Sequence, residues 1–122
     1  MSDPGFHRTP EQIAGGEAEL RAASFLAGHG LAILARNYRT RLGEIDVIAR
    51  EGEVLVFVEV RMRSESRFGG ALESVTPRKQ RRIASAAQMY LRQFPRAPRC
   101  RFDVIALDAG EIRWLKAAFE LS

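Results

Sequence analysis

The chain has 122 residues, of which 46% are hydrophobic and 28% charged, and its net charge is +4. This length suits one domain with its own core, and the composition is that of a folded chain rather than a disordered one. No apolar run reaches the roughly 18 residues of a membrane span, and the N-terminus lacks the apolar segment of a signal peptide. We therefore expect a cytoplasmic protein without membrane contact.

The cysteine and histidine content limits the kinds of metal site. The one cysteine, Cys100, excludes an internal disulfide and a zinc site built from several cysteines. Because the chain has only two histidines, carboxylates would have to hold most of any metal ion. Such a donor set favours Mg²⁺ or Mn²⁺.

In chain order, the sequence predicts a flexible tail over residues 1–8 and a single domain over residues 9–122. Thr9-Pro10 and Thr76-Pro77 are typical of helix starts, and Glu51-Gly52-Glu53 is typical of a hairpin turn. The predicted order of one helix, three strands, one helix and two strands indicates a mixed α/β fold with helices packed on a central sheet. The expected bounds are 10–27, 31–38, 44–50, 54–62, 77–93, 102–107 and 111–115.

Glu19 stands out on the first predicted helix. At about 100° per residue it lies at the centre of a face of small and apolar residues, namely Gly15, Ala22, Ala23 and Leu26. Burial of an unpaired carboxylate is costly. We therefore expect either a structural ion pair between Glu19 and an arginine or a place for Glu19 in a metal or catalytic site.

The predicted hairpin carries two further acids. Strand alternation puts Asp46 on one face with Glu44 and Ile48, and puts Ile45, Val47 and Ala49 on the other. Glu59 and Arg61 share a face of the second strand. A two-residue loop at 51–52 would oppose Glu44 to Glu59, and a four-residue loop over 51–54 would oppose Asp46 to Glu59. Either length places Asp46, Glu59 and Arg61 on one face within about 8 Å.

Facing carboxylates repel each other, so this arrangement requires an explanation. A divalent cation that bridges Asp46 and Glu59 would provide one, with Arg61 binding a phosphate or its developing charge. The alternative is a surface strand with solvated charges, in which Arg61 pairs with Glu44 or Glu59.

A basic segment follows the hairpin. Between Ser74 and Arg101 the chain has eight basic residues and no acidic one. Part of this charge falls in the first turns of the second helix, whose N-terminus adds positive potential. We expect this cluster to contact a phosphate backbone, the alternative being a solvated face. The candidate nucleic-acid-binding residues are Arg63, Arg78, Lys79, Gln80, Arg81 and Arg82.

The segments 43–49 (Gly-Glu-Ile-Asp-Val-Ile-Ala) and 56–61 (Val-Phe-Val-Glu-Val-Arg) together resemble the YraN family of restriction-endonuclease-like proteins. The similarity continues through residues 68–71, 75–80 and 101–106 and reaches Trp114, Ala118 and Phe119. This family is similar to the PD-(D/E)xK nucleases, particularly the archaeal Holliday-junction resolvases. The resemblance implies an αβββαβ restriction-endonuclease-like core with an additional C-terminal strand.

The resemblance also implies roles for individual residues. Asp46 matches the motif aspartate, Glu59 the second metal-binding acid, and Glu19 the glutamate of the first helix. Arg61 stands where the superfamily usually has lysine. Because arginine keeps its proton near neutral pH, Arg61 can stabilise charge but cannot act as a base.

The function implied is that of an endonuclease dependent on Mg²⁺ or Mn²⁺. It would act on DNA rather than RNA, with both linear and branched or structured forms as candidate substrates, and the similarity to resolvases is compatible with a homodimer. The alternative is a catalytically inactive module on the same fold that binds nucleic acid or recruits a partner.

Overall fold

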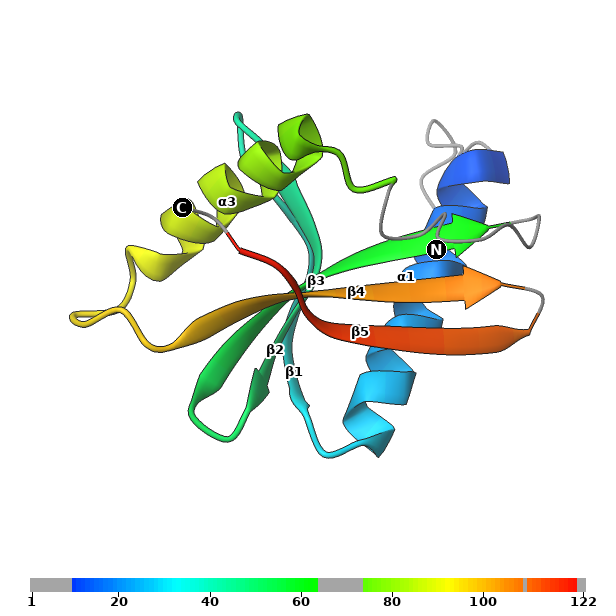
Figure 1. The fold of residues 1–122 in the computed structure, drawn as a ribbon, viewed down its shortest axis with the longest axis horizontal. Coiled ribbons are helices and arrows are strands. Elements are labelled where there is room, and N and C mark those ends of the chain that lie inside the picture. The colour runs from blue at the N-terminus through cyan, green and yellow to red at the C-terminus, as the bar shows by residue number, and fades with distance from the viewer. Residues whose placement is uncertain (1–9, 64–73, 109, 121–122) are drawn as a thin grey trace, which may run out of the picture.

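The computed structural model describes residues 10–63, 74–108 and 110–120 (Figure 1). The predicted tail over residues 1–8 and the motif residues 68–71 lie outside the described residues. Within the described part, the elements follow the predicted order. They are α1 (Pro10–Gly28), β1 (Ala32–Arg39), β2 (Glu44–Glu51), β3 (Val54–Arg63), α3 (Pro77–Leu91), β4 (Cys100–Asp108) and β5 (Glu111–Phe119).

The five strands of the described chain form one mixed sheet in the order β1-β2-β3-β4-β5. β3 and β4 are parallel, and the other neighbouring strands are antiparallel. α3 lies in the crossover that a parallel pair requires. The predicted fold class, a mixed α/β fold with a central mixed sheet, flanking helices and an additional C-terminal strand, is confirmed. No helix in the described ranges is both long enough and apolar enough to span a membrane.

The two helices cover opposite faces of this sheet, because side chains alternate along β3. Val56 and Val58 pack in a core with residues of α1, whereas Leu55 and Phe57 pack in a core with residues of α3. The helix residues fully buried in these cores are Ala18, Ala22 and Leu26 on α1 and Ile83, Ala86 and Ala87 on α3.

The sheet is irregular at Asp46. Its neighbours Ile45 and Val47 pack on opposite sides, Ile45 in the α3 core and Val47 in the α1 core. The prediction that these two residues share a face is therefore wrong, because the regular alternation of side chains between the two faces of the sheet is interrupted at this point. On the adjacent strand, Asn37 adopts a left-handed conformation with φ of 58°. Asn37 lies between the pairs that join β1 to Ile45 and Val47, so both strands are distorted together.

The pairing of β2 with β3 also ends here. Glu51 pairs with Val54, so the turn itself is residues 52–53, but the register is the one expected for the four-residue loop over 51–54. The ladder continues only as far as Val47 and Val58. In the same register Asp46 would stand opposite Glu59. Figure 1 shows the two strands diverging beyond this point. We call this divergence the fork.

Candidate functional site

Asp46 is positioned by the backbone at the fork. Its Oδ2 accepts a hydrogen bond of 2.8 Å from the backbone N–H of Val60. This donor lies beyond the last recorded β2–β3 pair, so the Asp46 carboxylate provides an acceptor where the ladder has ended. The bond holds the aspartate of β2 against β3.

Glu59 lies beside Asp46. Its neighbours along the strand, Val58 and Val60, pack in the α1 core, so the side chain of Glu59 faces the α3 side of the sheet. Burial, a side-chain hydrogen bond with Asp46 and the charge of Asp46 raise the pKa of Glu59 to about 9. Arg61 and Lys79 act in the opposite direction on that pKa but do not outweigh the burial. At neutral pH the pair of Asp46 and Glu59 therefore retains one proton, held between the two carboxyl groups. The expected proximity of Asp46, Glu59 and Arg61 is confirmed.

Glu19 approaches from the other side of the sheet. It is half-buried on the helix face that carries the buried residues Ala18, Ala22 and Ala23, as the helical spacing predicted. Burial and the charge of Asp46 raise the pKa of Glu19 to about 7. Its Oε1 is inaccessible to solvent and has no hydrogen-bond partner among the described residues.

The three acids are near one another without forming a closed cluster. Among the described residues, no three Asp, Glu, His or Cys side chains are grouped as metal ligands. Asp46 and Glu59 are in contact, and the charge of Asp46 acts on Glu19. The three acids are therefore a contacting pair, Asp46 and Glu59, with Glu19 on the α1 side of the sheet.

Two arginines of β1 partly offset the negative charge of Glu19, and the sequence analysis identified neither of them. Arg36 and Arg39 lower the pKa of Glu19, although no ion pair joins either of them to Glu19 in the described structure. Arg39 instead pairs with Glu44 at 3.3 Å between Nε and Oε2. The available signal was the concentration of arginines at 36, 39 and 41, just before the acidic strand.

Arg61 is held by a hydroxyl group that precedes α3. Its Nε donates to Oγ of Ser74 at 2.9 Å, and its side chain is half-buried. The guanidinium is close enough to Glu59 to lower the pKa of that carboxyl. Arg61 thus lies between the acid pair and the start of α3.

The basic cluster at the start of α3 has several roles. Thr76 begins the helix by accepting from the backbone N–H of Lys79, and the Gln80 side chain donates to the carbonyl of Val75 at 3.0 Å. Gln80 therefore supports the helix start. Lys79 is half-buried and acts on Glu59 through its charge. The exposed members of the cluster are Arg78, Arg81 and Arg82, and the side chain of Arg63 lies outside the described residues.

The turn between β1 and β2 packs on α3. Oγ1 of Thr40 accepts from the backbone N–H groups of Leu42 and Gly43 and donates to the Gly43 carbonyl, and the backbone N–H of Thr40 donates to that carbonyl at 2.8 Å. Gly43 is buried, and a Cβ at this position would clash with the backbone of Arg82. This contact explains the glycine that precedes Glu44 in the motif.

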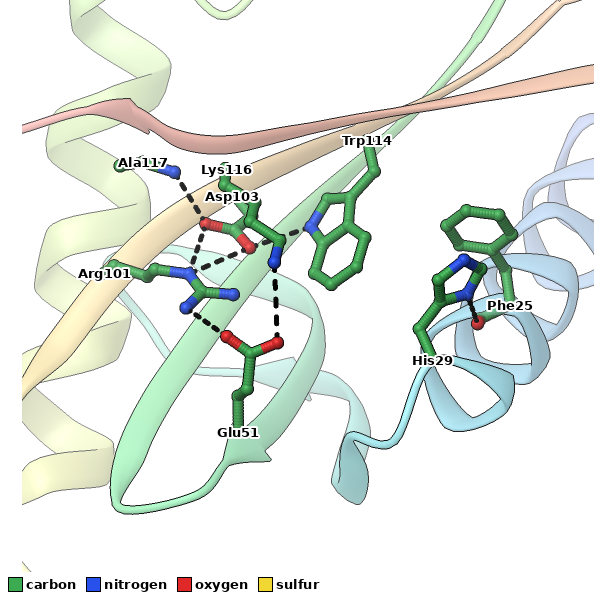
Figure 2. Close-up of polar contacts among 8 residues, drawn as sticks. All are labelled: Phe25, His29, Glu51, Arg101, Asp103, Trp114, Lys116 and Ala117. Carbon is green, nitrogen blue, oxygen red and sulfur yellow. Dashed lines mark hydrogen bonds and ion pairs between the residues drawn. The ribbon is translucent and has the colours of Figure 1, made fainter.

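A separate polar network stabilises the sheet near the β2–β3 hairpin (Figure 2). The fully buried Asp103 accepts from Nε of Arg101, Nε1 of Trp114 and the backbone N–H of Ala117. Arg101 also donates to Glu51 at 2.6 Å. Its charge is therefore used inside the fold, and the basic segment does not act as one surface.

Comparisons with known proteins agree with the motifs. The model of the uncharacterised protein family UPF0102 matches residues 18–107. A UPF0102 protein of Janthinobacterium sp. is 51% identical over 113 residues, covering 93% of this chain and 92% of the relative. A UPF0102 protein of Ralstonia pickettii is 53% identical over 116 residues, covering 90% and 93%. Glu19, Asp46, Glu59 and Arg61 all lie within the matched region. The chain therefore belongs to the UPF0102 family, which is the YraN family that its motifs resemble.

Proposed function

We propose that this protein is a divalent-metal-dependent endonuclease that hydrolyses phosphodiester bonds in DNA. The observation that carries the proposal is the contact between Asp46 and Glu59 at the fork, where burial and repulsion keep one proton on the pair. A half-buried pair of acids that must retain a proton lowers stability, and such perturbed groups are more common at functional sites than elsewhere. The resemblance to PD-(D/E)xK nucleases assigns the same two residues to metal binding.

The residues at the fork are suited to a hard divalent cation. All the donors are carboxylate oxygens, which Mg²⁺ and Mn²⁺ prefer. The buried Oε1 of Glu19 has no hydrogen-bond partner in the described structure, and a cation would compensate it. Asp46 and Glu59 would hold the ion, with Glu19 as the third carboxylate. When bound, the ion would supply Lewis-acid activation of the phosphodiester and of the attacking water.

Two cationic side chains are available to stabilise charge that develops on the phosphate. Arg61 is oriented by Ser74, and Lys79 lies near enough to Glu59 to affect its pKa. Arg61 stays protonated throughout, so its role is electrostatic and the proton of the attacking water goes elsewhere. The exposed arginines at 78, 81 and 82 would position the nucleic-acid backbone.

The first test is cleavage by the purified chain in Mn²⁺ and in Mg²⁺. Substrates are a supercoiled plasmid, a linear duplex, a four-way junction and a structured RNA. We expect nicking or junction cleavage that is lost in Asp46→Asn and Glu59→Gln and retained in Glu53→Gln, whose side chain lies in the exposed hairpin turn. Absence of cleavage of every substrate by the wild type would refute the proposal, as would full activity of Asp46→Asn. Cleavage of RNA alone would refute the assignment to DNA.

The second test measures metal binding without catalysis. Electron paramagnetic resonance follows free Mn²⁺ during titration with wild-type protein, Glu59→Gln and Glu53→Gln. The proposal requires uptake of Mn²⁺ by the wild type and by Glu53→Gln, with a strong reduction in Glu59→Gln.

The second candidate function is a non-catalytic module that binds nucleic acid. It is favoured by the lack of a three-residue metal-ligand group in the described residues and by arginine in place of lysine at position 61. This candidate predicts DNA binding that weakens with salt, together with no Mn²⁺ uptake.

A further inference from the structure

Asn37 of β1 has an unusual backbone conformation. Its φ is 58°, and among the residues that the structure describes only Ala117 is another non-glycine residue with positive φ. Such a conformation is disfavoured for any residue that has a Cβ, although asparagine tolerates it better than most. Residues held in it are more frequent at functional sites than elsewhere. The position of Asn37 in the sheet indicates what this conformation serves.

Asn37 lies opposite Asp46 in the antiparallel register of β1 and β2. Each of the two is the single residue between the same two recorded pairs, which are Arg36 with Val47 and Tyr38 with Ile45. The left-handed residue and the candidate metal ligand therefore occupy one position of the sheet.

Both strands change their facing at this position. On β2, Val47 packs in the α1 core, whereas Ile45 packs in the α3 core. On β1, Tyr38 packs in the α3 core, and Arg36 faces α1 with its paired residue. In a regular strand, residues two apart would share a face. The left-handed conformation of Asn37 therefore allows β1 to follow the change in β2 while the pairs on both sides of it are kept.

The change of facing leaves the Asp46 side chain directed at β3. Its Oδ2 accepts from the backbone N–H of Val60 at 2.8 Å, and backbone N–H groups in a sheet point sideways toward the neighbouring strand. The carboxylate is therefore open to both faces, with Glu59 bonded to it from the α3 side and Glu19 on the α1 side. In a regular β2 the Asp46 side chain would point to one face alone. Its place between the other two acids depends on the irregular backbone.

The amide of Asn37 makes a different and weaker contribution. Its Oδ1 accepts from Nε of Arg39 at 3.2 Å, and the same Nε lies 3.3 Å from Oε2 of Glu44. All three side chains are exposed, and polar contacts between exposed side chains contribute little to stability. The placement of Asp46 should therefore depend on the backbone conformation at position 37 rather than on the amide.

We propose that Asn37 is a positioning residue for the acid site. Its left-handed backbone keeps the Asp46 carboxylate directed at β3, between Glu59 and Glu19. Asn37 acts on a bound cation only through Asp46. The role of the cation rests on the proposed function, but the placement of Asp46 can be tested without metal.

The experiment uses four variants of the full-length chain, each checked for folding by circular dichroism. Asn37→Gly keeps access to the left-handed conformation, whereas Asn37→Val strongly favours an extended backbone. Ala117→Val is the matched control, because it forces the same change at the other left-handed residue, on β5 at the opposite end of the strand order. Asp46→Ala shows what complete loss of the carboxylate does.

The first measurement is hydrogen exchange of backbone amides by NMR without divalent metal. The reporter is the Val60 amide, which bonds to Asp46, and the reference is Val56, which pairs with Ala49 within the ladder. Asp46→Ala and Asn37→Val should speed exchange at Val60 by about tenfold more than at Val56. Asn37→Gly should leave the ratio of the two rates unchanged. Ala117→Val should also leave it unchanged, even where the variant is less stable.

The second measurement is Mn²⁺ uptake, followed by electron paramagnetic resonance. Asn37→Val should bind Mn²⁺ about tenfold more weakly than the wild type, whereas Asn37→Gly and Ala117→Val should bind it normally. If Asn37→Val does not fold, Asn37→Ala takes its place, with the same direction of change expected.

Three results would overturn the inference. They are normal protection of Val60 in the extended-favouring variant, unchanged Mn²⁺ uptake by that variant, and equal impairment of Asn37→Gly. If the exchange results hold while the wild type takes up no Mn²⁺, the metal-dependent nuclease proposal fails and the placement of Asp46 by Asn37 stands.

Discussion

Asp46 and Glu59 would pair across β2 and β3 if the ladder continued, but it ends one pair earlier, at Val47 and Val58. The Asp46 carboxylate bonds to the backbone of Val60 instead. Two acids that would repel each other across a regular ladder are thus kept together where the strands separate. This arrangement makes the site locally destabilising, and the first prediction follows from it.

Glu59→Gln should stabilise the protein at alkaline pH. The unfolded Glu59 ionises near its ordinary value of 4.5, whereas the pKa in the folded protein is raised to about 9. Folding must therefore return a proton to Glu59 between these values, and stability falls as the pH rises through this range. The melting temperature of Glu59→Gln, followed by circular dichroism, should exceed that of the wild type by a few degrees at about pH 8 and match it at about pH 4.

The control for this prediction is Glu53→Gln, in the exposed hairpin turn. It should show no gain that grows with pH. A shift of equal size at both pH values would mean that the effect of Glu59→Gln is not due to its proton.

Glu51 should have the opposite pH dependence. Its hydrogen bond with Arg101 lowers its pKa below 4.5 and outweighs the effect of burial. The carboxylate therefore contributes stability at neutral pH that is lost as the pH falls below about 4.5. Glu51→Gln should lower the melting temperature at neutral pH, and the difference from the wild type should shrink under acid. A difference that stays constant down to about pH 3 would contradict this account.

Asp103→Asn should strongly destabilise the fold. Asp103 is fully buried and its described partners are all donors, two from side chains and one from the backbone. An asparagine amide would direct its own N–H groups at some of these donors. The free energy of unfolding in urea should fall by roughly 3–5 kcal/mol. The chain's one tryptophan, Trp114, reports the transition by fluorescence.

The comparison for Asp103→Asn is Glu111→Gln, an exposed position at the start of β5. Its loss should be close to zero. If Asp103→Asn is as stable as Glu111→Gln, the network around Asp103 does not support β5.

Gly43→Ala should displace the turn between β1 and β2 from α3. The added Cβ would meet the backbone of Arg82, which cannot move as a side chain could. We expect a loss of roughly 1–3 kcal/mol in thermal or urea unfolding. Gly28→Ala is the control, because no atom lies within 4 Å of a Cβ built there. Equal stability of the two variants would show that the turn does not depend on close packing.

The exposed arginines of α3 should determine the salt dependence of DNA binding. Replacing Arg78, Arg81 and Arg82 together with glutamine removes up to three phosphate contacts. The slope of log affinity against log salt should become shallower by about 2–3. The control replaces the three arginines that follow the helix, Arg92, Arg96 and Arg99, which are also exposed. Equal changes in both variants would show that the charge acts without regard to position.

Much of the fold could be predicted from periodicity. Glu19 was located correctly because helical spacing fixes the face on which a residue lies, and burial of its neighbours follows that face. The hairpin parity was also sufficient to bring Asp46 near Glu59. The end of β5 was missed, since the alternation of side chains is interrupted after Leu115 and the strand continues past Ala117, whose φ is 49°. There the backbone bonds to Asp103, a contact that local sequence does not reveal.

The candidate site was predicted less completely than the fold. Strand alternation gave the wrong face for Ile45, because it assumes a regular backbone and the strand is distorted at Asp46. The bond from the Gln80 amide to the carbonyl of Val75 was not foreseen, and the expected contact of Gln80 with nucleic acid stays a prediction. Arg36 and Arg39 were missed because their effect on Glu19 depends on how α1 packs beside β1.

The ion network of Glu51, Arg101 and Asp103 belongs to the closed end of the β2–β3 hairpin, whereas the acid pair belongs to the fork. Among the residues that the structure describes, the two groups share no side-chain partner, so the effects of substitutions in them should add. Substitutions that stabilise the closed end of the hairpin can therefore compensate for the stability that is lost when residues at the fork are changed. To obtain a thermostable background for variants of Asp46 and Glu59, stabilising substitutions are best made at the closed end of the hairpin.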